Sequence, residues 1–465
     1  MSNTWTNESV AFNPLFKEDK LLGFAVVSKN YQYFYSSEID YKQLLKEAKN
    51  VIVFNGYLLK DQLNDSEFSF TKHNFQSLYF QLNSTVKFQN IEDIIKEECY
   101  SIDLENTHYI INPEGSKQCV IAAYFMLQYY LKNYKRVNKD ILKLDNTLLE
   151  KFSTRKTHIL VDQCSLRTDL SLLQKRRWDL ERKLFNKIGY PVQNAVAIKD
   201  PVLAQDDRVL STLDKIKTYK TDIEYLEKYI DIKKVEISFD VTATATSRIL
   251  CRDRKHDIGL FAPSNNFKKY FCCSNNQMFI SADYNRQEAF ILATVSKDEQ
   301  LYEDIQNKDF YSRLARWVIK DTSKQTGKLI FYAVIYGSSV NSLAHSLNIS
   351  EERAEAIINK IGKRYRKLFI WLRTFNEDHN FFGRKLHKNT VNAYIQSTAA
   401  DLIRMKLIET IDYNPVLVLA DNIIYCVTSD RVANSLNEIL LSFSISPFKG
   451  LTTDPIASYS LDFTL

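Results

Sequence analysis

The sequence lacks the residue patterns that mark disulfide scaffolds, zinc sites and membrane spans. Its seven cysteines form no Cys-x-x-Cys pair, and its seven histidines are scattered and form no His-Glu-x-x-His motif. An odd number of cysteines without metal-ligand spacing indicates reduced thiols in a cytosol-like compartment. No apolar run approaches the roughly 20 residues that cross a bilayer, so the sequence predicts no membrane partner.

Glycine is also scarce, with ten residues in a chain of 465, so a glycine at a motif position carries more information than usual. The length indicates several subdomains, and the 45% of hydrophobic residues supply ample material for a folded interior. The net charge of +6, from 62 basic and 56 acidic residues, is only weak evidence for a nucleic-acid partner. The basic clusters Gln174–Lys183 and Gly362–Lys367 fit a solvated helix face equally well.

The apolar pattern changes along the chain. Residues 1 to about 145 mix short strand-like and helical runs, which is typical of an α/β unit, and residues from about 146 to 235 are helical and strongly charged. Strand-like runs follow at Lys234–Leu250 and Gln277–Asn285, and a long helical region covers about 287 to 376. The last ninety or so residues mix a helix with a strand pair.

Two carboxylates stand at unusual places. The run VLVLADNIIYCV, Val416–Val427, reads as a buried strand or a tight hairpin, and Asp421 lies in its middle. Buried aspartate is rare unless it is paired or holds a metal. Asp283 lies near the end of the strand-like run Gln277–Asn285, and Glu288 follows it five residues later. Taken singly, each aspartate also fits a hydrogen-bonded turn residue.

Two further groups repeat at helical spacing. Four residues recur every four positions and therefore share one helix face: Lys324, Lys328, Tyr332 and Tyr336. This face could bind a nucleoside triphosphate, with the lysines contacting the phosphates and the rings contacting the base. A solvated helix face has the same pattern. Asn392 and Gln396 lie one turn apart, where their amides could read polar edges or simply face water.

Five stretches, in order, resemble motifs of the family A DNA polymerases of the bacterial DNA polymerase I type. The resemblance covers roughly residues 236 to 465 and rests on the order and spacing of the motifs. The stretches are TATSR (Thr244–Arg248), SADYNRQE (Ser281–Glu288), KQTGKLIFYAVIYG (Lys324–Gly337), NAYIQSTAAD (Asn392–Asp401) and LADNIIYCV (Leu419–Val427).

The resemblance implies an α/β (α+β) fold of the right-hand polymerase type, preceded by an RNase H-like domain of the 3′–5′ exonuclease type. The aspartate and glutamate of the exonuclease motif are absent near the N-terminus, where Glu8 stands alone, so we expect a degenerate domain without proofreading. The implied division is 1–145 exonuclease-like domain, 146–235 thumb, 236–286 first part of the palm, 287–379 fingers and 380–465 second part of the palm.

The resemblance also assigns roles to residues. Asp283 and Asp421 fall on the two metal-binding aspartates and would hold two Mg²⁺ ions, for which Mn²⁺ could substitute. Lys328 matches the lysine that meets the triphosphate, and we count it with the aspartates as catalytic. The substrate-binding positions are Lys324 (where the family has arginine), Tyr332 beside the sugar, Glu288 against a ribose 2′-hydroxyl and Tyr336 by the templating base. The duplex-binding positions are Arg248, Asn392 and Gln396.

At four further positions the motifs carry a different residue from the one usual in the family. Ser247 and Ala333 replace glycines, Ala420 replaces a histidine, and Asn422 replaces a glutamate beside Asp421. Neither Ala420 nor Asn422 is a primary metal ligand, so we expect the two-metal scheme to survive with altered rate or metal affinity.

The sequence therefore predicts a template-directed DNA polymerase that extends a primer with dNTPs. Its expected partners are primer–template DNA, dNTPs and replication accessory proteins, and its expected location is the cytoplasm, at a nucleoid or at a viral, plasmid or organelle replication site. Two alternatives stay open. One is a catalytically impaired relative that binds DNA or scaffolds a replisome. The other is a single-subunit RNA polymerase, which has the same pattern of aspartates, lysine and Tyr-Gly.

Overall fold

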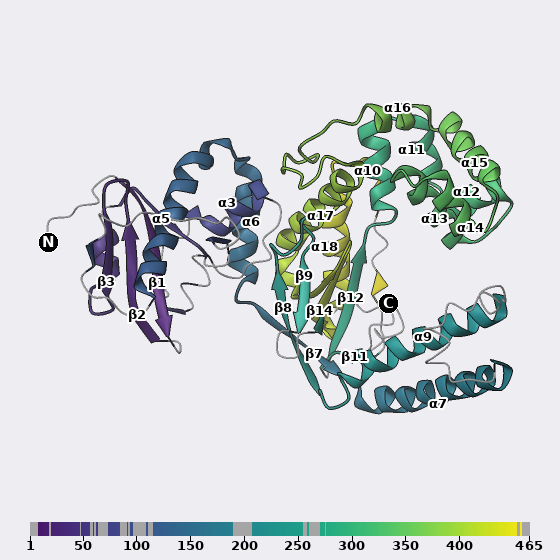
Figure 1. Ribbon diagram of the computed structural model, residues 1–465, viewed down its shortest axis with the longest axis horizontal. Coiled ribbons are helices and arrows are strands. Elements are labelled where there is room, and N and C mark those ends of the chain that lie inside the picture. Colours follow the sequence, from purple (N-terminus) through teal and green to yellow (C-terminus); the bar gives the residue numbers. More distant parts are fainter. Residues whose placement is uncertain are drawn as a thin grey trace.

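The computed structural model describes residues 8–457, apart from 18–19, 47, 56–58, 60–61, 64–72, 84–90, 92–93, 96–107, 110–114, 189–206, 254–257, 260–269, 275 and 453–455. Within these residues, no helix is both long and apolar enough to cross a membrane. Figure 1 shows a sheet-and-helix module at the N-terminal end, two central sheets, a cluster of short helices above them and a pair of long helices below.

The N-terminal module consists of a six-stranded sheet with helices on both faces. Its elements are β1 (Ser9–Lys17), β2 (Lys20–Val27), β3 (Gln32–Ser36), α1 (Tyr41–Leu45), β4 (Asn50–Val53), β5 (His73–Asn74), α3 (Phe75–Asn83), β6 (His108–Tyr109) and α5 (Ser116–Asn133). The strand order is β5-β4-β1-β2-β3-β6, with β1, β2 and β3 antiparallel and the outer pairings parallel.

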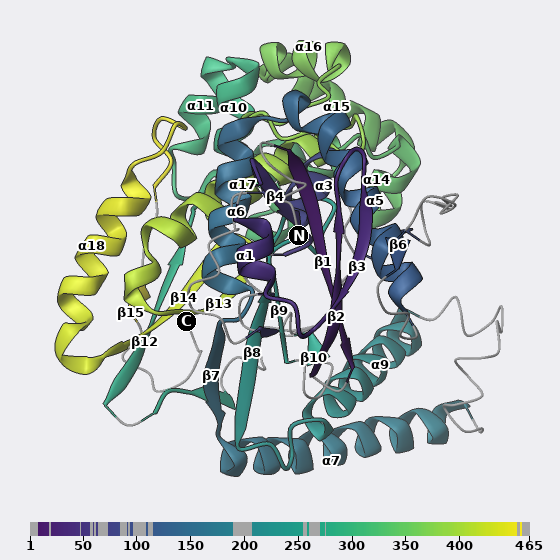
Figure 2. The ribbon, with the colours of Figure 1, turned by 90° about the vertical axis from the view of Figure 1, so that its left-hand side faces the viewer.

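Alternation along β1 explains why this sheet is covered on both faces. Ala11 packs in one apolar cluster with α3 and α5, whereas Val10 and Phe12 pack in another with α1. Successive side chains of a strand point to opposite faces, so an uninterrupted apolar run requires cover on both sides. Figure 2 shows the sheet nearly edge-on, with α1 on one side of it and α5 on the other.

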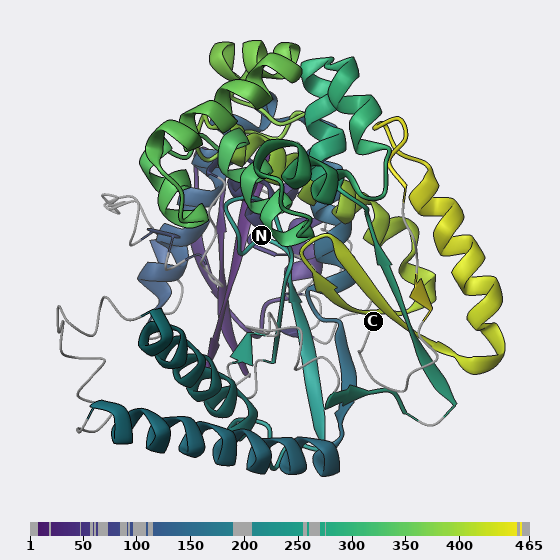
Figure 3. The ribbon, with the colours of Figure 1, turned by 90° about the vertical axis from the view of Figure 1, so that its right-hand side faces the viewer.

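The next elements along the chain are the 3₁₀ turn η1 (Tyr134–Arg136), α6 (Lys139–Phe152), β7 (Lys156–Val161), α7 (Gln163–Ile188) and α9 (Asp207–Glu227). The two long helices α7 and α9 form a helical arm next to the first central sheet. They share a small apolar cluster of Leu184, Val209 and Ile216. Figure 3 shows the arm on one side of the central sheets and the short helices on the other.

Two central sheets form the middle of the molecule. The first, in the order β10-β9-β8-β7-β11, adds β8 (Lys234–Asp240), β9 (Leu250–Asp253), β10 (Ile258–Gly259) and β11 (Phe271–Cys272) to β7. The second, in the order β13-β14-β12-β15, contains β12 (Gln277–Asp283), β13 (Pro415–Leu419), β14 (Asn422–Thr428) and β15 (Ile456–Ala457). Thr157 of β7 donates to the carbonyl of Val416 at 2.9 Å, which joins the two sheets.

Helices complete the structure between and after the strands of the second sheet. The helical module consists of α10 (Gln287–Ser296), α11 (Glu299–Ile305), α12 (Phe310–Ile319), α13 (Lys324–Ile335), α14 (Val340–Leu347), α15 (Glu351–Arg364) and α16 (Arg366–Thr374). The later helices are α17 (Val391–Glu409) and α18 (Val432–Ser444), with the 3₁₀ turns η4 (Ile411–Tyr413) and η5 (Ser429–Arg431).

The helices α12 and α13 pack unusually closely. A Cβ atom on Gly327 of α13 would lie 1.9 Å from the backbone carbonyl oxygen of Tyr311 on α12. Only a residue without a side chain fits there. This glycine therefore sets how closely α13 approaches α12 and, with it, the position of the lysine and tyrosine side chains on α13.

The expected strand or hairpin at residues 416–427 is a hairpin, and the expected helical region from about 287 to 376 contains the seven helices of the helical module. Two of the predicted domain limits fall inside elements: 145/146 lies within α6, and 235/236 lies within β8. The strand β7, which lies in the range predicted as thumb, pairs with β8 in the first central sheet. Sequence pattern cannot reveal such pairing, and the division into domains stays a prediction.

Candidate active site

The register of the second central sheet brings the two aspartates together. β12 and β14 are antiparallel, and Asp283, the last residue of β12, pairs with Asn422, the first residue of β14. Cα atoms of such pairs lie about 4.5–5.5 Å apart. Asp421 directly precedes Asn422, so two carboxylates 138 positions apart (421 − 283) lie at one edge of the sheet. Asp283 is exposed and Asp421 is half-buried.

A two-residue turn, Ala420 and Asp421, joins β13 to β14. Ala420 takes a φ of +57°, a left-handed conformation that hairpin turns of this length require at the first central position. The neighbouring Asn422 side chain exchanges hydrogen bonds with the Ser281 hydroxyl of β12, at 2.9 and 2.7 Å. The Asn422 amide therefore fixes the start of β14 to β12, next to Asp421.

Glu288 lies in the first turn of α10 and connects three parts of the chain. It accepts a hydrogen bond of 2.6 Å from the Tyr336 hydroxyl and forms an ion pair of 3.5 Å with Arg248. Burial raises the pKa of Glu288 and the charge of Asp421 raises it further, while Tyr336 and Arg248 oppose this; the net shift is upward. Glu288 follows Asp283 by only five residues, so it lies close to the aspartate edge.

The tyrosines of α13 form a layer above this carboxylate. Tyr332 stacks on Tyr336, with ring centroids 5.8 Å apart and an interplanar angle of 19°. The hydroxyl oxygens of Tyr332 and Tyr311 lie 2.9 Å apart, and the Lys328 Nζ atom lies 5.7 Å from the centroid of the Tyr311 ring. Burial is the main cause that raises the pKa of Tyr311, to about 12, so this phenol stays protonated at neutral pH.

Tyr311 is the site residue that sequence reasoning missed. It lies on α12, outside the four-residue repeat of α13, and reaches the site only because Gly327 lets the two helices approach. Its position in the sequence shows no periodicity with Lys328 or Tyr332. A pattern along one helix does not report which residue of the neighbouring helix completes the group.

The predicted lysine–tyrosine stripe lies on α13, with Tyr336 at its C-terminal cap. Both lysines, Lys324 and Lys328, are exposed, and no carboxylate in the described part of the chain pairs with either. Their positive charges are therefore available to an anionic ligand. Five of the predicted residues form one connected group in the structure. Direct contacts link Arg248 to Glu288, Glu288 to Tyr336, and Tyr336 to Tyr332. Tyr311 then links Tyr332 to Lys328.

Asn392 and Gln396 lie apart from that group. Both are on α17, the first exposed and the second half-buried, one turn apart as predicted. The helix itself is fixed to α10, because Gln287 donates to the carbonyl of Ala399 at 3.2 Å. No hydrogen bond or ion pair among the described residues links either amide to the aspartate edge.

The donor set at the aspartate edge fits magnesium. Asp283 and Asp421 offer carboxylate oxygens, and no group of three or more His, Cys, Asp or Glu suited to a metal occurs in the described ranges. Mg²⁺ is typically bound through one or two protein carboxylates, with water and substrate phosphate oxygens completing its shell. A dedicated zinc site would need more protein ligands. The two neighbouring carboxylates therefore suit a divalent cation bound together with a phosphate ligand.

Comparison with known proteins agrees with this geometry. Residues 177–383 match the family model described as DNA polymerase family A. The thermostable DNA polymerase I of Thermus aquaticus is 24% identical over 284 residues, which cover 50% of this chain and 34% of that protein. DNA polymerase I of Caldicellulosiruptor bescii is 24% identical over 460 residues, covering 71% and 53%. The matched part of the chain thus spans about a third to a half of the length of these relatives.

A solved structure resembles the whole chain. The POL domain of Pol1 from M. smegmatis, in complex with a DNA primer-template and dNTP, gives a TM-score of 0.72 at 14% identity and covers 99% of this chain and 96% of that domain. This match confirms the predicted mixed α/β fold of the polymerase type. The exonuclease-like character of residues 1–145 and the roles of the single site residues stay predictions.

Proposed function

The chain is a divergent member of the family A DNA polymerases, and from this premise we propose that it extends the 3′ end of a primer on a DNA template with dNTPs. The observation that carries the proposal is the β12–β14 register, which sets Asp283 beside Asp421. Around that edge stand Glu288, whose pKa the Asp421 charge raises, and the tyrosine and lysine face of α13. Primer–template DNA and dNTPs are accordingly the proposed partners.

In the proposed reaction, this chain's residues position the reactants and balance their charge. Asp283 and Asp421 would hold Mg²⁺ (or Mn²⁺), which when bound activates a hydroxyl nucleophile and neutralises the charge of a pyrophosphate leaving group. Lys324 and Lys328 hold the triphosphate through their exposed ammonium groups. Phosphoryl transfer needs little more than such positioning and charge stabilisation, so no protein general base is required.

The tyrosine layer and Glu288 shape the sugar and base side of the pocket. Tyr332 and Tyr336 are protonated phenols whose rings stack on each other, so they offer flat surfaces and no negative charge. Glu288 is held in place by Tyr336 and Arg248 and fills the space against a ribose 2′-hydroxyl. We therefore propose preference for dNTPs over rNTPs, with Arg248, Asn392 and Gln396 on the duplex near the primer end.

The remaining parts are proposed by position. The helical arm would serve as thumb, the helical module as fingers, and the central sheets as palm. We also propose that the N-terminal module lacks proofreading, because Glu8 stands without the partner carboxylates that exonuclease chemistry needs. Replication accessory proteins as partners, and a site in the cytoplasm, nucleoid or a viral, plasmid or organelle replicon, belong to the same proposal.

The test is extension of a labelled primer–template by the wild type, Asp283→Asn, Asp421→Asn and Asp430→Asn. Asp430 is an exposed aspartate just after β14 and serves as the matched control. We expect the wild type and Asp430→Asn to extend with dNTPs and Mg²⁺, and the other two variants to lose roughly 100-fold or more.

Other results would identify the alternatives. A wild type that binds primer–template but extends it with neither Mg²⁺ nor Mn²⁺ would support the impaired, DNA-binding relative. Preference for rNTPs would support an RNA polymerase. Excision of a mismatched 3′ end would contradict the loss of proofreading while leaving the polymerase proposal intact.

A further inference from the structure

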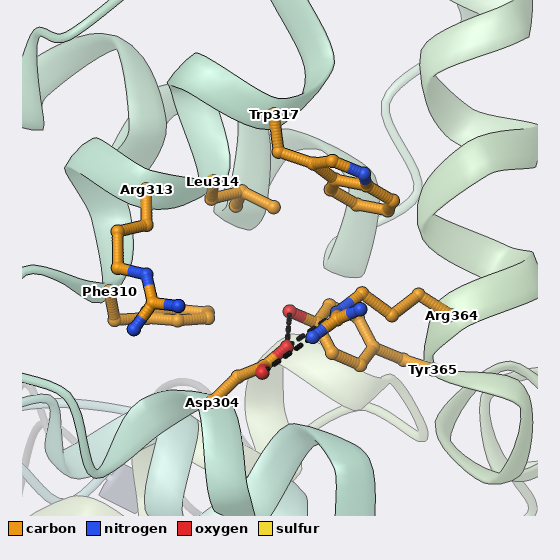
Figure 4. A pocket seen from close by; sticks show the side chains of 7 residues that line it. All are labelled: Asp304, Phe310, Arg313, Leu314, Trp317, Arg364 and Tyr365. Carbon is orange, nitrogen blue, oxygen red and sulfur yellow. Dashed lines mark hydrogen bonds and ion pairs between the residues drawn. The ribbon is translucent and has the colours of Figure 1, made fainter.

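A pocket outside the proposed catalytic centre lies in the helical module, between the end of α11, one face of α12 and the end of α15 (Figure 4). Its volume is about 180 Å³. Three aromatic rings line it, those of Phe310, Trp317 and Tyr365, together with the guanidinium groups of Arg313 and Arg364. Phe310, Arg313 and Trp317 stand at positions i, i+3 and i+7 of α12, so one face of a single helix supplies most of the lining.

The one carboxylate in the lining is already neutralised. Asp304 accepts from Arg364 Nε at 2.6 Å, from Arg364 Nη2 at 2.7 Å and from the Tyr365 hydroxyl at 2.8 Å. Figure 4 shows these three groups together on one side of the pocket, with Arg313 on the other. Among the described residues, no carboxylate pairs with the exposed Arg313 guanidinium, so this cation is available to a ligand.

Further cations surround Trp317. The Lys360 Nζ atom lies 4.7 Å from the centroid of the Trp317 ring, and the Arg364 Cζ atom lies 5.5 Å from it. Lys363 of α15 is also exposed. The pocket therefore combines aromatic faces with a surrounding positive surface, which is the pattern that single-stranded nucleic acid selects: bases stack on rings while cations follow the phosphates.

We propose that this pocket binds an unpaired nucleotide of single-stranded DNA, with the base against Trp317 and a neighbouring phosphate on Arg313. The volume supports a flat group rather than a whole nucleoside triphosphate, because pockets that enclose larger ligands measure roughly 300–1,000 Å³. The spread of cations over α12 and α15 suits a chain of phosphates better than a single compact anion.

The location makes the unpaired template strand the proposed source of this nucleotide, and this step rests on the proposed function. Phe310 in the pocket and Tyr311 in the catalytic centre are consecutive residues of α12. The two sites therefore occupy different faces of one helix, whose diameter with side chains is about 10–12 Å. A template strand that leaves the catalytic centre ahead of the primer end needs only a short path to reach the pocket.

The test compares binding of two primer–templates that share one duplex and differ in the 5′ overhang, about 2 or about 12 nucleotides, because single-strand sites span roughly 4–16 nucleotides. The proteins are the wild type, Trp317→Ala, Trp317→Phe, Arg313→Gln and Arg316→Gln. The last variant loses the same charge from the same helix but does not line the pocket. Affinity is measured by fluorescence anisotropy, and extension of the short-overhang template is measured in parallel.

We expect Trp317→Ala to bind the long-overhang template about 5- to 100-fold more weakly than the wild type, as loss of a stacked base predicts. Arg313→Gln should also weaken this binding, because it removes a phosphate contact. Binding and extension of the short-overhang template should not change, and Trp317→Phe should keep most of the affinity. An equal loss on both templates, an equal loss in Arg316→Gln, or no loss in any variant would overturn the proposal.

A second measurement separates this inference from the proposed function and from a free-nucleotide site. Quenching of Trp317 fluorescence, taken as the difference between the wild type and Trp317→Phe, is titrated with oligo(dT) and with dTMP. Saturation by oligo(dT) at far lower concentration supports the single-strand site even if no primer is extended. Equal affinity for dTMP, or no quenching by oligo(dT), would contradict it.

Discussion

Replacing Asp145 by asparagine should destabilise the protein more than any surface change, because its carboxylate lies in a buried charge cluster. Asp145 of α6 is inaccessible to solvent and accepts hydrogen bonds from Arg384 Nη1 at 2.8 Å, Arg384 Nη2 at 2.7 Å and Arg404 Nη2 at 2.6 Å. Asp401 of α17 contacts the same two arginines, so two carboxylates balance two guanidinium groups. Asp145→Asn leaves one positive charge uncompensated in the interior.

The expected magnitude follows from these contacts. Hydrogen bonds to charged groups contribute roughly 1.5–3 kcal/mol each, so three of them set an upper bound of about 9 kcal/mol. Asparagine keeps one acceptor oxygen, and removal of one partner from a buried ion pair typically costs about 3–5 kcal/mol. Arginine does not relieve the imbalance by losing its proton. A loss of 3–5 kcal/mol is a large part of the roughly 5–15 kcal/mol that stabilise a typical protein.

The same cluster predicts a pH dependence. Burial opposes ionisation of Asp145, but the charges and hydrogen bonds of Arg384 and Arg404 outweigh it and hold the pKa of Asp145 below its usual value. A depressed folded-state pKa stabilises the fold above the unfolded value of about 3.9, and the stabilisation is lost as the pH falls through the folded value. The difference between the wild type and Asp145→Asn should therefore be full at neutral pH and shrink below about pH 4.

The assay is urea unfolding, followed by far-UV circular dichroism at neutral and acidic pH. Asp140→Asn serves as control, because Asp140 is an exposed aspartate in the first turn of the same helix. The control should lose at most about 1 kcal/mol, from its interaction with the helix dipole. An equal loss in both variants, or a difference that does not shrink in acid, would refute the reasoning.

Three further predictions concern the site. Gly327→Ala should lower the melting temperature and raise the KM for dNTPs, because the new Cβ meets the Tyr311 carbonyl. The control Gly337→Ala should cost only backbone strain of roughly 1 kcal/mol. Equal effects of the two variants in calorimetry and kinetics would contradict this reasoning. Glu288→Gln should stabilise the protein at neutral pH, because a carboxyl group with a raised pKa loses stability for the fold as the pH rises through that pKa; thermal melts across pH check this. The same variant should reject rNTPs less strongly, which competition between dNTPs and rNTPs checks. Tyr311→Phe should cost roughly 0.5–1.5 kcal/mol of stability and change the KM for dNTPs through the released Tyr332 hydroxyl, measured by melting and steady-state extension.

The sequence predicts what is local or carried by motifs. The stripe on α13 follows from a four-residue repeat, and the hairpin around Asp421 follows from two β-branched runs with a polar break. The proximity of Asp283 and Asp421 was expected from their motifs and agrees with the strand register. The role of the Asn422 amide was not predictable, because its partner Ser281 lies 141 positions away and is chosen by that register.

The buried charge cluster shows the same limit more strongly. Asp145 stands at the end of the range expected to form the exonuclease-like domain, yet its carboxylate contacts Arg384 and Arg404, 239 and 259 positions later. The apolar stripe of α6 places position 145 on the buried face of the helix, but it does not identify the arginines that pair with the carboxylate. Its position becomes meaningful only when α17 packs against α6, which is a property of the tertiary structure.

These contacts give the N-terminal module a structural role beside the central sheets. Phe80 of α3 lies beneath the Arg404 guanidinium, 5.6 Å from ring centroid to Cζ, and Gln76 of the same helix donates to Thr242 at 2.9 Å. Arg404 in turn donates to the carbonyl of Ser247, at 3.2 Å. Ser247 directly precedes Arg248, whose guanidinium pairs with Glu288 in the candidate active site. The module is therefore part of the support on which Arg248 rests, and its removal would leave buried charges exposed and this loop without its packing.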